Sequence, residues 1–305
     1  MMINISISDN DNALHTKLLD IRDNSEILEE VKFTTSLINP QFDFHYLNKA
    51  FRDVENLFRG NYPGFQKCNT KYHDLRHTMM VLLAMARLIH GAVLRGEKFT
   101  DKEINLGLIA ALMHDTGYIQ VNDDNLGTGA KYTLIHIKRS IVFAQDYYAE
   151  ENYFRTDLVC FRDILLCTGL SIDIKKITFP STNIEIIGKM LGTADLLSQM
   201  ADRFYLEKLT PLFHEFEEGN VSGFESEFDL LKKTTDFYKS VQARFENDLG
   251  NVQDYMINHF RDRWNIERNI YNESIEKNIN YLKKILKNNY KNLHVCLRRN
   301  TLIVQ

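Results

Sequence analysis

The chain has 305 residues, of which 44% are hydrophobic and 26% are charged, the ordinary balance of a globular protein. It contains only 4 prolines and 14 glycines, which favours long helices over a turn-rich sandwich or barrel. The formal net charge of −4 excludes a global basic field that would attract a nucleic-acid polymer or an anionic membrane, although a metal site would supply local positive charge for a nucleotide-sized ligand.

Apolar periodicity predicts helices along most of the chain, after a polar and loose segment at residues 1–12. A loop containing Pro63 and Gly64 is expected at 61–70, and a second loop at 117–129. The expected helices cover 14–58 (two or three helices), 72–95, 104–113, 132–150, 154–168, 183–217, 222–249 and 252–290.

The helix start near residue 100 has the clearest local signal. Thr100 followed by Glu103 is the pattern of a capping box in front of an apolar run. That run, residues 104–113, is almost devoid of polar side chains, which is typical of a buried central helix.

These elements predict an all-α fold: a single helical bundle at 13–250, with a long C-terminal helical extension at 251–305. The apolar positions of the extension would either pack on the bundle or pair with a second copy, giving a homodimer.

The cellular setting is predicted to be the cytoplasm, without a membrane partner. The four cysteines form no CxxC pair, which argues against a disulfide framework or a thiolate zinc site. The first twelve residues have neither the basic leader nor the apolar segment of a signal peptide. No stretch is expected to reach the roughly 18 apolar residues that cross a bilayer.

The dipeptide His114-Asp115 ends the apolar run, so both side chains are expected at or near the core. A buried carboxylate costs several kcal/mol unless a cation compensates it, and that cation could be a metal ion or an Arg or Lys side chain. The alternative is a helix C-terminus with a hydrogen-bonded histidine.

Two further segments favour the metal. His73 and His77 are four residues apart and would share one face of a helix. Asp195 interrupts another apolar helix, although it could equally belong to a solvated face. Imidazole and carboxylate ligands together suit one or two divalent ions such as Mn, Fe, Zn, Ni or Mg.

The order H…HD…D, preceded by Tyr72-His73-x-x-x-His77, resembles the HD superfamily of metal-dependent phosphohydrolases over about residues 70–265. Within it, the class I cyclic nucleotide phosphodiesterases are the most similar branch. The resemblance implies an HD-type helical bundle in which His73 is the general acid. It implies a metal site made by His77, His114, Asp115 and Asp195, with Asp115 bridging to a second ion and acting as a catalytic residue.

The phosphodiesterase branch implies further contacts. A Gln and a Phe three residues later read and stack the purine base there, so Gln242 and Phe245 are candidate base-binding residues. The alternative is an amphipathic helix face. The chain departs from that branch at Tyr118, where the branch has His, and at Asp74, where it has Asn, and both departures put cyclic nucleotide activity in doubt.

The segment around His136 resembles the helix that gives other HD proteins an additional histidine near a second metal ion. His136 is therefore a candidate second-metal ligand or phosphate contact, or else a surface histidine. Lys131 and Arg139 are candidate phosphate contacts, or else solvated surface charges.

The sequence thus predicts an enzyme that hydrolyses a small phosphoester, a nucleotide or cyclic nucleotide phosphodiester, by attack of a metal-bound hydroxide. His73 would protonate the leaving oxygen. The alternatives are a phosphomonoesterase or nucleotidase that uses the same site, a non-catalytic HD module that senses nucleotides, and a purely structural helical protein.

Overall fold

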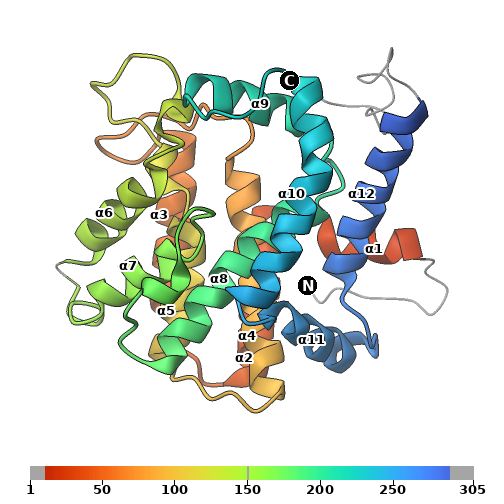
Figure 1. The fold of residues 1–305 in the computed structure, drawn as a ribbon. Helices are drawn as coiled ribbons and strands as arrows, with labels where there is room; N and C mark the ends of the chain where they lie inside the picture. The colour runs from red at the N-terminus through yellow and green to blue at the C-terminus, as the bar shows by residue number, and fades with distance from the viewer. Residues whose placement is uncertain (1–10, 150, 289–305) are drawn as a thin grey trace.

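The computed structural model describes residues 11–149 and 151–288, and in this part of the chain the fold is all-α, as predicted (Figure 1). The only extended pairing among these residues is an isolated bridge between Phe65 and Val121. The α-helices are α1 Asp11–Leu19, α2 Asn24–Ile38, α3 His45–Arg59, α4 Leu75–Leu94, α5 Asp101–Met113, α6 His136–Tyr148, α7 Leu158–Leu166, α8 Thr182–Ala201, α9 Leu209–Glu218, α10 Glu227–Asn247, α11 Tyr255–Trp264 and α12 Ile270–Asn288.

Helices α4 and α5 form the centre of the molecule because both are apolar on nearly every side. The capping box of α5 is confirmed, since Thr100 Oγ1 accepts from Glu103 N and the Glu103 carboxylate accepts from Thr100 N. All residues from Ile104 to Met113 are buried. The two helices are consecutive and pack against each other, so the start of α4 lies near the end of α5.

Helix α4 corrects the expectation that no stretch could cross a bilayer. Residues Leu75–Leu94 are long and apolar enough to do so, with a mean hydropathy of 1.5. However, 89% of this stretch is buried inside the protein. Its apolar surface is therefore covered by the other helices of the chain, as in the core helix of a globular domain.

The structure also corrects the prediction of a single helix at 183–217. The chain leaves helical geometry after Ala201 and resumes at Leu209, so a connector at 202–208 separates α8 from α9. The backbone of Asp202 is extended rather than helical.

The C-terminal segment is also divided. Asn265, with a φ of 55°, ends α11 in the left-handed conformation, which Asn tolerates better than most residues. Helix α12 then buries a continuous apolar face against the same chain. The members of this face are Ile270, Tyr271, Ile275, Ile279, Leu282 and Ile285. The apolar positions that raised the homodimer alternative are thus covered within the chain itself.

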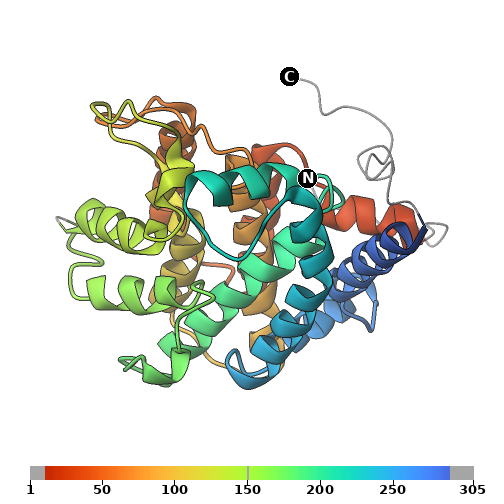
Figure 2. The same cartoon turned by 45° about the horizontal axis from the view of Figure 1, so that its top comes forward.

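Two views show how the remaining helices surround this core (Figures 1 and 2). Helices α6 and α7 lie on one side, while α1 and α12 lie side by side on the other. Helix α11 crosses the C-terminal half of α4 so closely that a Cβ atom at Gly91 would meet Tyr255 O at 1.9 Å. Helix α9 runs across one end of the bundle.

Candidate metal centre

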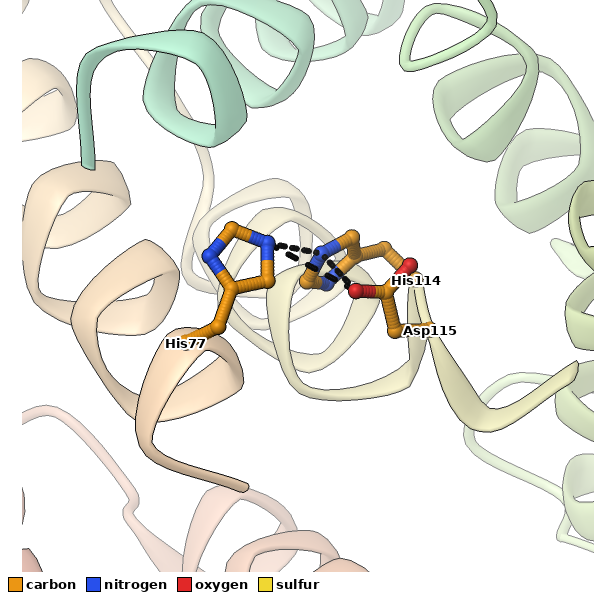
Figure 3. Close-up of side chains that lie close together, drawn as sticks. All are labelled: His77, His114 and Asp115. Atoms are coloured by element: carbon orange, nitrogen blue, oxygen red, sulfur yellow. Dashed lines mark hydrogen bonds and ion pairs between the residues drawn. The ribbon is translucent and has the colours of Figure 1, made fainter. Parts of the chain in front are cut away.

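The candidate site is formed where three core helices meet. His77 lies in the first turn of α4, and His114 and Asp115 directly follow the last residue of α5. Asp195 lies two turns before the end of α8. Figure 3 shows the His77 ring on α4 facing the His114 ring and the Asp115 carboxylate. Residues far apart in the sequence thus present ligand atoms to the same interior region.

The ligand atoms lie at close distances. His77 Nε2 is 3.3 Å from His114 Nε2 and 3.5 Å from Asp115 Oδ2, and His114 Nε2 is 3.2 Å from that same oxygen. One ligand atom from each of these three buried side chains lies within 4.8 Å of the others. Asp195 Oδ1 borders the group, 3.1 Å from His77 Nε2 and 3.9 Å from His114 Nε2.

These distances fit a shared cation. Ligand atoms bound to one ion at about 2.0–2.2 Å are separated from each other by about 3.0–3.5 Å. Asp115 Oδ2 is fully buried and accepts no hydrogen bond from any described residue. An unsatisfied carboxylate oxygen in the interior is costly unless an ion occupies its free side. Nor does any lysine or arginine of the described residues pair with Asp115 or Asp195.

The histidine orientations also fit metal binding. The Nδ1–H group of His114 donates to Ala111 O at 2.8 Å, which leaves Nε2 directed at the site. Such a hydrogen bond fixes the tautomer in which Nε2 carries a free lone pair. The backbone N of His77 donates to Asp74 at 2.8 Å, so the N-cap of α4 positions this residue.

The pKa values show that the site favours positive charge. Burial alone would lower the pKa of His114, but the Asp115 and Asp195 carboxylates outweigh it and raise the pKa to about 9. Burial opposes ionisation of both carboxyls, yet the neighbouring histidines hold the pKa of Asp115 and of Asp195 below the usual range. The negative charge of the site therefore attracts a cation, whether a proton or a metal ion.

Asp195 is held by its own helix. Gln199 Nε2 donates to Asp195 Oδ1 at 3.1 Å, and Gln199 Oε1 in turn accepts from the Tyr72 hydroxyl at 3.0 Å. The Asp195 side chain is only 14% exposed, so it is not part of a solvated face. Its orientation is thus fixed by a chain of hydrogen bonds that joins α8 to the segment before α4.

His73 corrects one detail of the sequence interpretation. It lies before α4, which begins at Leu75, so His73 and His77 do not share a helix face. The bend before the helix nevertheless brings the two rings to a centroid distance of 6.3 Å. His73 therefore lies beside the candidate metal ligands.

Glu215 on α9 is the residue that sequence reasoning missed. One of its carboxylate oxygens accepts from His73 Nδ1 at 2.7 Å, and the other accepts from the backbone N of Lys71 and of Tyr72. Burial lowers the pKa of His73, but the Glu215 carboxylate and the neighbouring acids raise it overall. The sequence signal was weak, because Glu215 lies in an ordinary acidic stretch and only its burial, at 5% exposed, sets it apart.

An aromatic stack extends the site toward α6. The Tyr118 ring lies between the rings of His73 and His136, with centroid distances of 4.3 Å and 4.6 Å. His136 Nδ1–H donates to Thr133 O at 2.6 Å, so the lone pair of the neutral ring is on Nε2. Burial lowers the pKa of His136, so its ring is neutral and suited to act as a ligand. Its role in metal or phosphate binding stays a prediction.

The two candidate phosphate contacts on this side have structural partners. Lys131 Nζ is paired with Asp124 and with Leu126 O. Arg139 donates from Nε to Gly117 O at 2.7 Å and from Nη2 to Ile119 O at 2.9 Å. Both cations thus hold the loop that follows Asp115, and these contacts argue against a primary role in binding phosphate.

The candidate base-binding residues are placed on α10. Phe245 is 1% exposed and belongs to the hydrophobic core, so its ring has no free face on which a base could stack. Gln242 is half-buried on the same helix. The burial of Phe245 therefore favours the amphipathic-helix interpretation of this pair.

A small cavity adjoins the metal centre. It has a volume of about 10 Å³, which is room for about one water molecule. Its lining residues are Tyr72, Arg76, His77, Met80, Ser198, Gln199, Asp202 and Lys208. Of the four candidate ligands, His77 is the one that lines this cavity.

Residues 120–256 match the model of a family described as Npun_R2479-like. The matched segment contains Asp195, His136 and Glu215 but begins after Asp115, so His77 and His114 also lie outside it. No curated protein matches the chain.

Proposed function

We propose that this protein is a metal-dependent phosphohydrolase that acts on a small phosphoester, in the manner of the HD superfamily that its sequence resembles. The observation that carries the proposal is the convergence of His77, His114, Asp115 and Asp195, in which the buried Oδ2 atom of Asp115 has no hydrogen-bond donor among the described residues. The adjacent His73–Glu215 pair supports a hydrolytic role, because a purely structural ion site needs no further histidine beside its ligands.

The four converging side chains would hold the ion through two imidazole nitrogens and two carboxylates. This donor set suits Mn, Fe, Zn, Ni or Mg. A divalent ion bound there would supply Lewis acidity and lower the pKa of a coordinated water. Burial of His114 and Asp115, at 2% and 3% exposed, keeps bulk water away from these ligands.

His73 is suited to be the general acid. Its Nδ1–H is held by Glu215, so the protonated ring can donate its other proton, on Nε2, to a leaving oxygen. Burial opposes protonation of His73, but the Glu215 carboxylate and the neighbouring acids raise its pKa overall and so favour the protonated ring. Glu215 acts through His73 and is therefore a positioning residue.

We also infer that the activity belongs to the cytoplasm. The thiols of Cys68, Cys160 and Cys167 are free, as in proteins of a reducing compartment.

Elemental analysis of the purified protein tests the proposal, with Asp115→Ala and Asp262→Ala compared with the wild type. Asp262 is a partly exposed acid that lies 3.8 Å from Nε2 of His90, whose ring contacts that of His259. Its variant is the matched control, because it also removes an acid beside a pair of histidines. We expect about one or two ions per chain in the wild type and in the control, and loss of the ions in Asp115→Ala. A wild-type protein that takes up no divalent metal would overturn the proposal.

Activity is then measured with added Mn on bis(p-nitrophenyl) phosphate and on p-nitrophenyl phosphate. We expect hydrolysis by the wild type and the control, and none above background by Asp115→Ala. The ratio of the two rates ranks diester against monoester substrates. Metal uptake without turnover of either ester would argue for a non-catalytic metal-binding module.

A further inference from the structure

A second and larger cavity is lined by residues of α1, of α12 and of the chain around the end of α8. Figure 2 shows α1 and α12 side by side at one edge of the molecule. Its volume is about 280 Å³, close to the lower limit of about 300 Å³ for small-molecule sites. The lining residues are His15, Thr16, Leu19, Asp20, Ala201, Arg203, Ser274, Lys277 and Asn278. None of them lines the cavity at the metal centre.

The lining carries uncompensated positive charge. Arg203 and Lys277 are exposed, and neither forms an ion pair with a described residue. Within the described part of the chain, Lys277 Nζ has one polar contact, with His15 Nε2 at 3.4 Å. The one acid of the lining, Asp20, is already paired with Arg76 at 2.5 Å. The nearby Glu273 is paired with His15 at 3.2 Å and with a second cation. Two cations therefore remain available to a ligand.

These cations are not needed to cap the end of α8. Ser274 Oγ donates to Ala201 O at 2.8 Å, and Asn278 Nδ2 donates to Met200 O at 2.9 Å and to Asp202 O at 3.0 Å. Side chains of α12 thus satisfy the terminal carbonyl groups of α8, which would otherwise attract Arg203 and Lys277. These hydrogen bonds hold α12 against the end of α8, and the side chains of Arg203 and Lys277 remain exposed.

We propose that this cavity binds a small phosphate-bearing ligand through Arg203 and Lys277. Phosphate oxygens provide the acceptors that a guanidinium and an ammonium group recognise. The hydroxyl groups of Thr16 and Ser274 line the same cavity and supply polar surface. The size of the cavity suits a pyrophosphate or a compact phosphorylated metabolite.

The position of Arg203 links this ligand to the metal centre. The connector 202–208 lines the larger cavity through Arg203 and the metal-centre cavity through Asp202 and Lys208, which pair at 2.7 Å. A ligand that draws Arg203 inward displaces Asp202, its neighbour in the chain. Occupation of the larger cavity therefore changes access to the metal centre, a consequence that rests on the proposed hydrolytic function.

Isothermal titration calorimetry with inorganic pyrophosphate tests the binding site, using the full-length protein after metal removal by a chelator and dialysis. We expect saturable binding by the wild type and about ten-fold weaker binding by Arg203→Ala and by Lys277→Ala, since each loses a charge-assisted contact. Lys284→Ala, an exposed lysine of the same helix outside the cavity, should bind within about two-fold of the wild type. Undetectable binding up to about 10 mM, or equal affinity in all four proteins, would overturn the site.

Hydrogen–deuterium exchange of the same metal-free proteins tests the link between the cavities, and its readout does not depend on catalysis. At a pyrophosphate concentration near the wild-type dissociation constant, the ligand should change the exchange of residues 202–208 in the wild type and much less in Lys277→Ala. Binding without any change in this connector would overturn the link and leave the binding site intact. Both results stand whether or not the protein hydrolyses phosphoesters.

Discussion

Helix α4 carries one member of each of two buried histidine pairs. At its start, His77 Nε2 lies 3.3 Å from His114 Nε2, and near its end His90 Nδ1 lies 3.1 Å from His259 Nδ1. The rings are steeply inclined in both pairs, by 70° and 87°. By geometry alone the two pairs are nearly equivalent.

Their surroundings differ in the sign of the charge. The first pair is faced by the carboxylates of Asp115 and Asp195, and the pKa of His114 is raised to about 9. Burial lowers the pKa of His90 to about 4, and burial with the cations Arg87 and Arg263 lowers the pKa of His259 well below its usual range.

The comparison indicates that nearby carboxylates, and not the proximity of two imidazoles alone, make a histidine pair a candidate cation site. Among the described residues, the acid that pairs with a histidine of the second pair is Asp262, at 3.8 Å from His90 Nε2 and 47% exposed. Solvent screens such a charge, so it does not offset the lowering of the pKa of His90 by burial.

The largest expected difference between the pairs is in metal affinity. His77→Ala should weaken Mn or Zn binding by at least about 1,000-fold, equivalent to about 4 kcal/mol, because it removes a ligand. His90→Ala should leave affinity within about two-fold. Competition with a chromogenic chelator measures both constants. Equal losses in the two variants would contradict the distinction drawn between the pairs.

We expect the charged residues around the second pair to affect the stability of the fold and not the binding of metal. Arg263 Nη2 and Glu30 Oε1 form an ion pair at 2.8 Å, with side chains 7% and 1% exposed. Glu30→Gln leaves buried positive charge unpaired, so we expect the free energy of unfolding to fall by about 3 to 4 kcal/mol, with metal content unchanged. The neighbouring Glu29→Gln, in an exposed pair, should cost less than about 0.5 kcal/mol. Urea denaturation compares them, and similar costs would refute the electrostatic account.

The pairs should also respond to pH in separate windows. The pKa of His90 falls from 6.5 in the unfolded chain to about 4 when folded, so protonation favours unfolding as the pH drops from 6.5 to 4. We expect a loss of about 3 kcal/mol from His90 in this window, and a flatter profile for His90→Gln.

In the metal-free protein His114 acts in the opposite sense. The pKa of His114 is about 9 in the folded protein and 6.5 in the unfolded chain. Its contribution to the free energy of unfolding is therefore complete below pH 6.5 and is lost as the pH rises through 9. Denaturant midpoints across the pH range measure both effects. A His90→Gln profile parallel to that of the wild type below pH 6.5 would be evidence against the assignment.

The smallest expected effect concerns the group that positions the acid. Glu215→Gln removes the carboxylate that raises the pKa of His73, so the alkaline limit of activity should move to lower pH and kcat should fall about 30-fold. Metal content should stay unchanged. Glu217→Gln, an exposed residue two positions away, is the control. Unaltered pH–rate profiles in both variants would exclude the proposed role of Glu215.

Local patterns were sufficient for the parts of the fold that depend on neighbouring residues. The Thr100–Glu103 capping box and the buried run from Ile104 to Met113 follow from interactions between residues a few positions apart. The same patterns predicted that His114 and Asp115 lie at or near the core. The set of four with His77 and Asp195 was implied by the resemblance to the HD superfamily, and in the structure the four side chains lie close together.

The sequence by itself therefore determined the helical class and the side chains available to a metal centre, because periodicity and residue chemistry are local properties. Tertiary structure alone decided how His73 is held, since its partner Glu215 lies 142 residues away. It also decided that Lys131 and Arg139 hold a loop and that Phe245 is enclosed. These outcomes depend on which helices pack together. The residues within a single turn do not indicate which distant segment will contact them, so these contacts could not be predicted from the sequence.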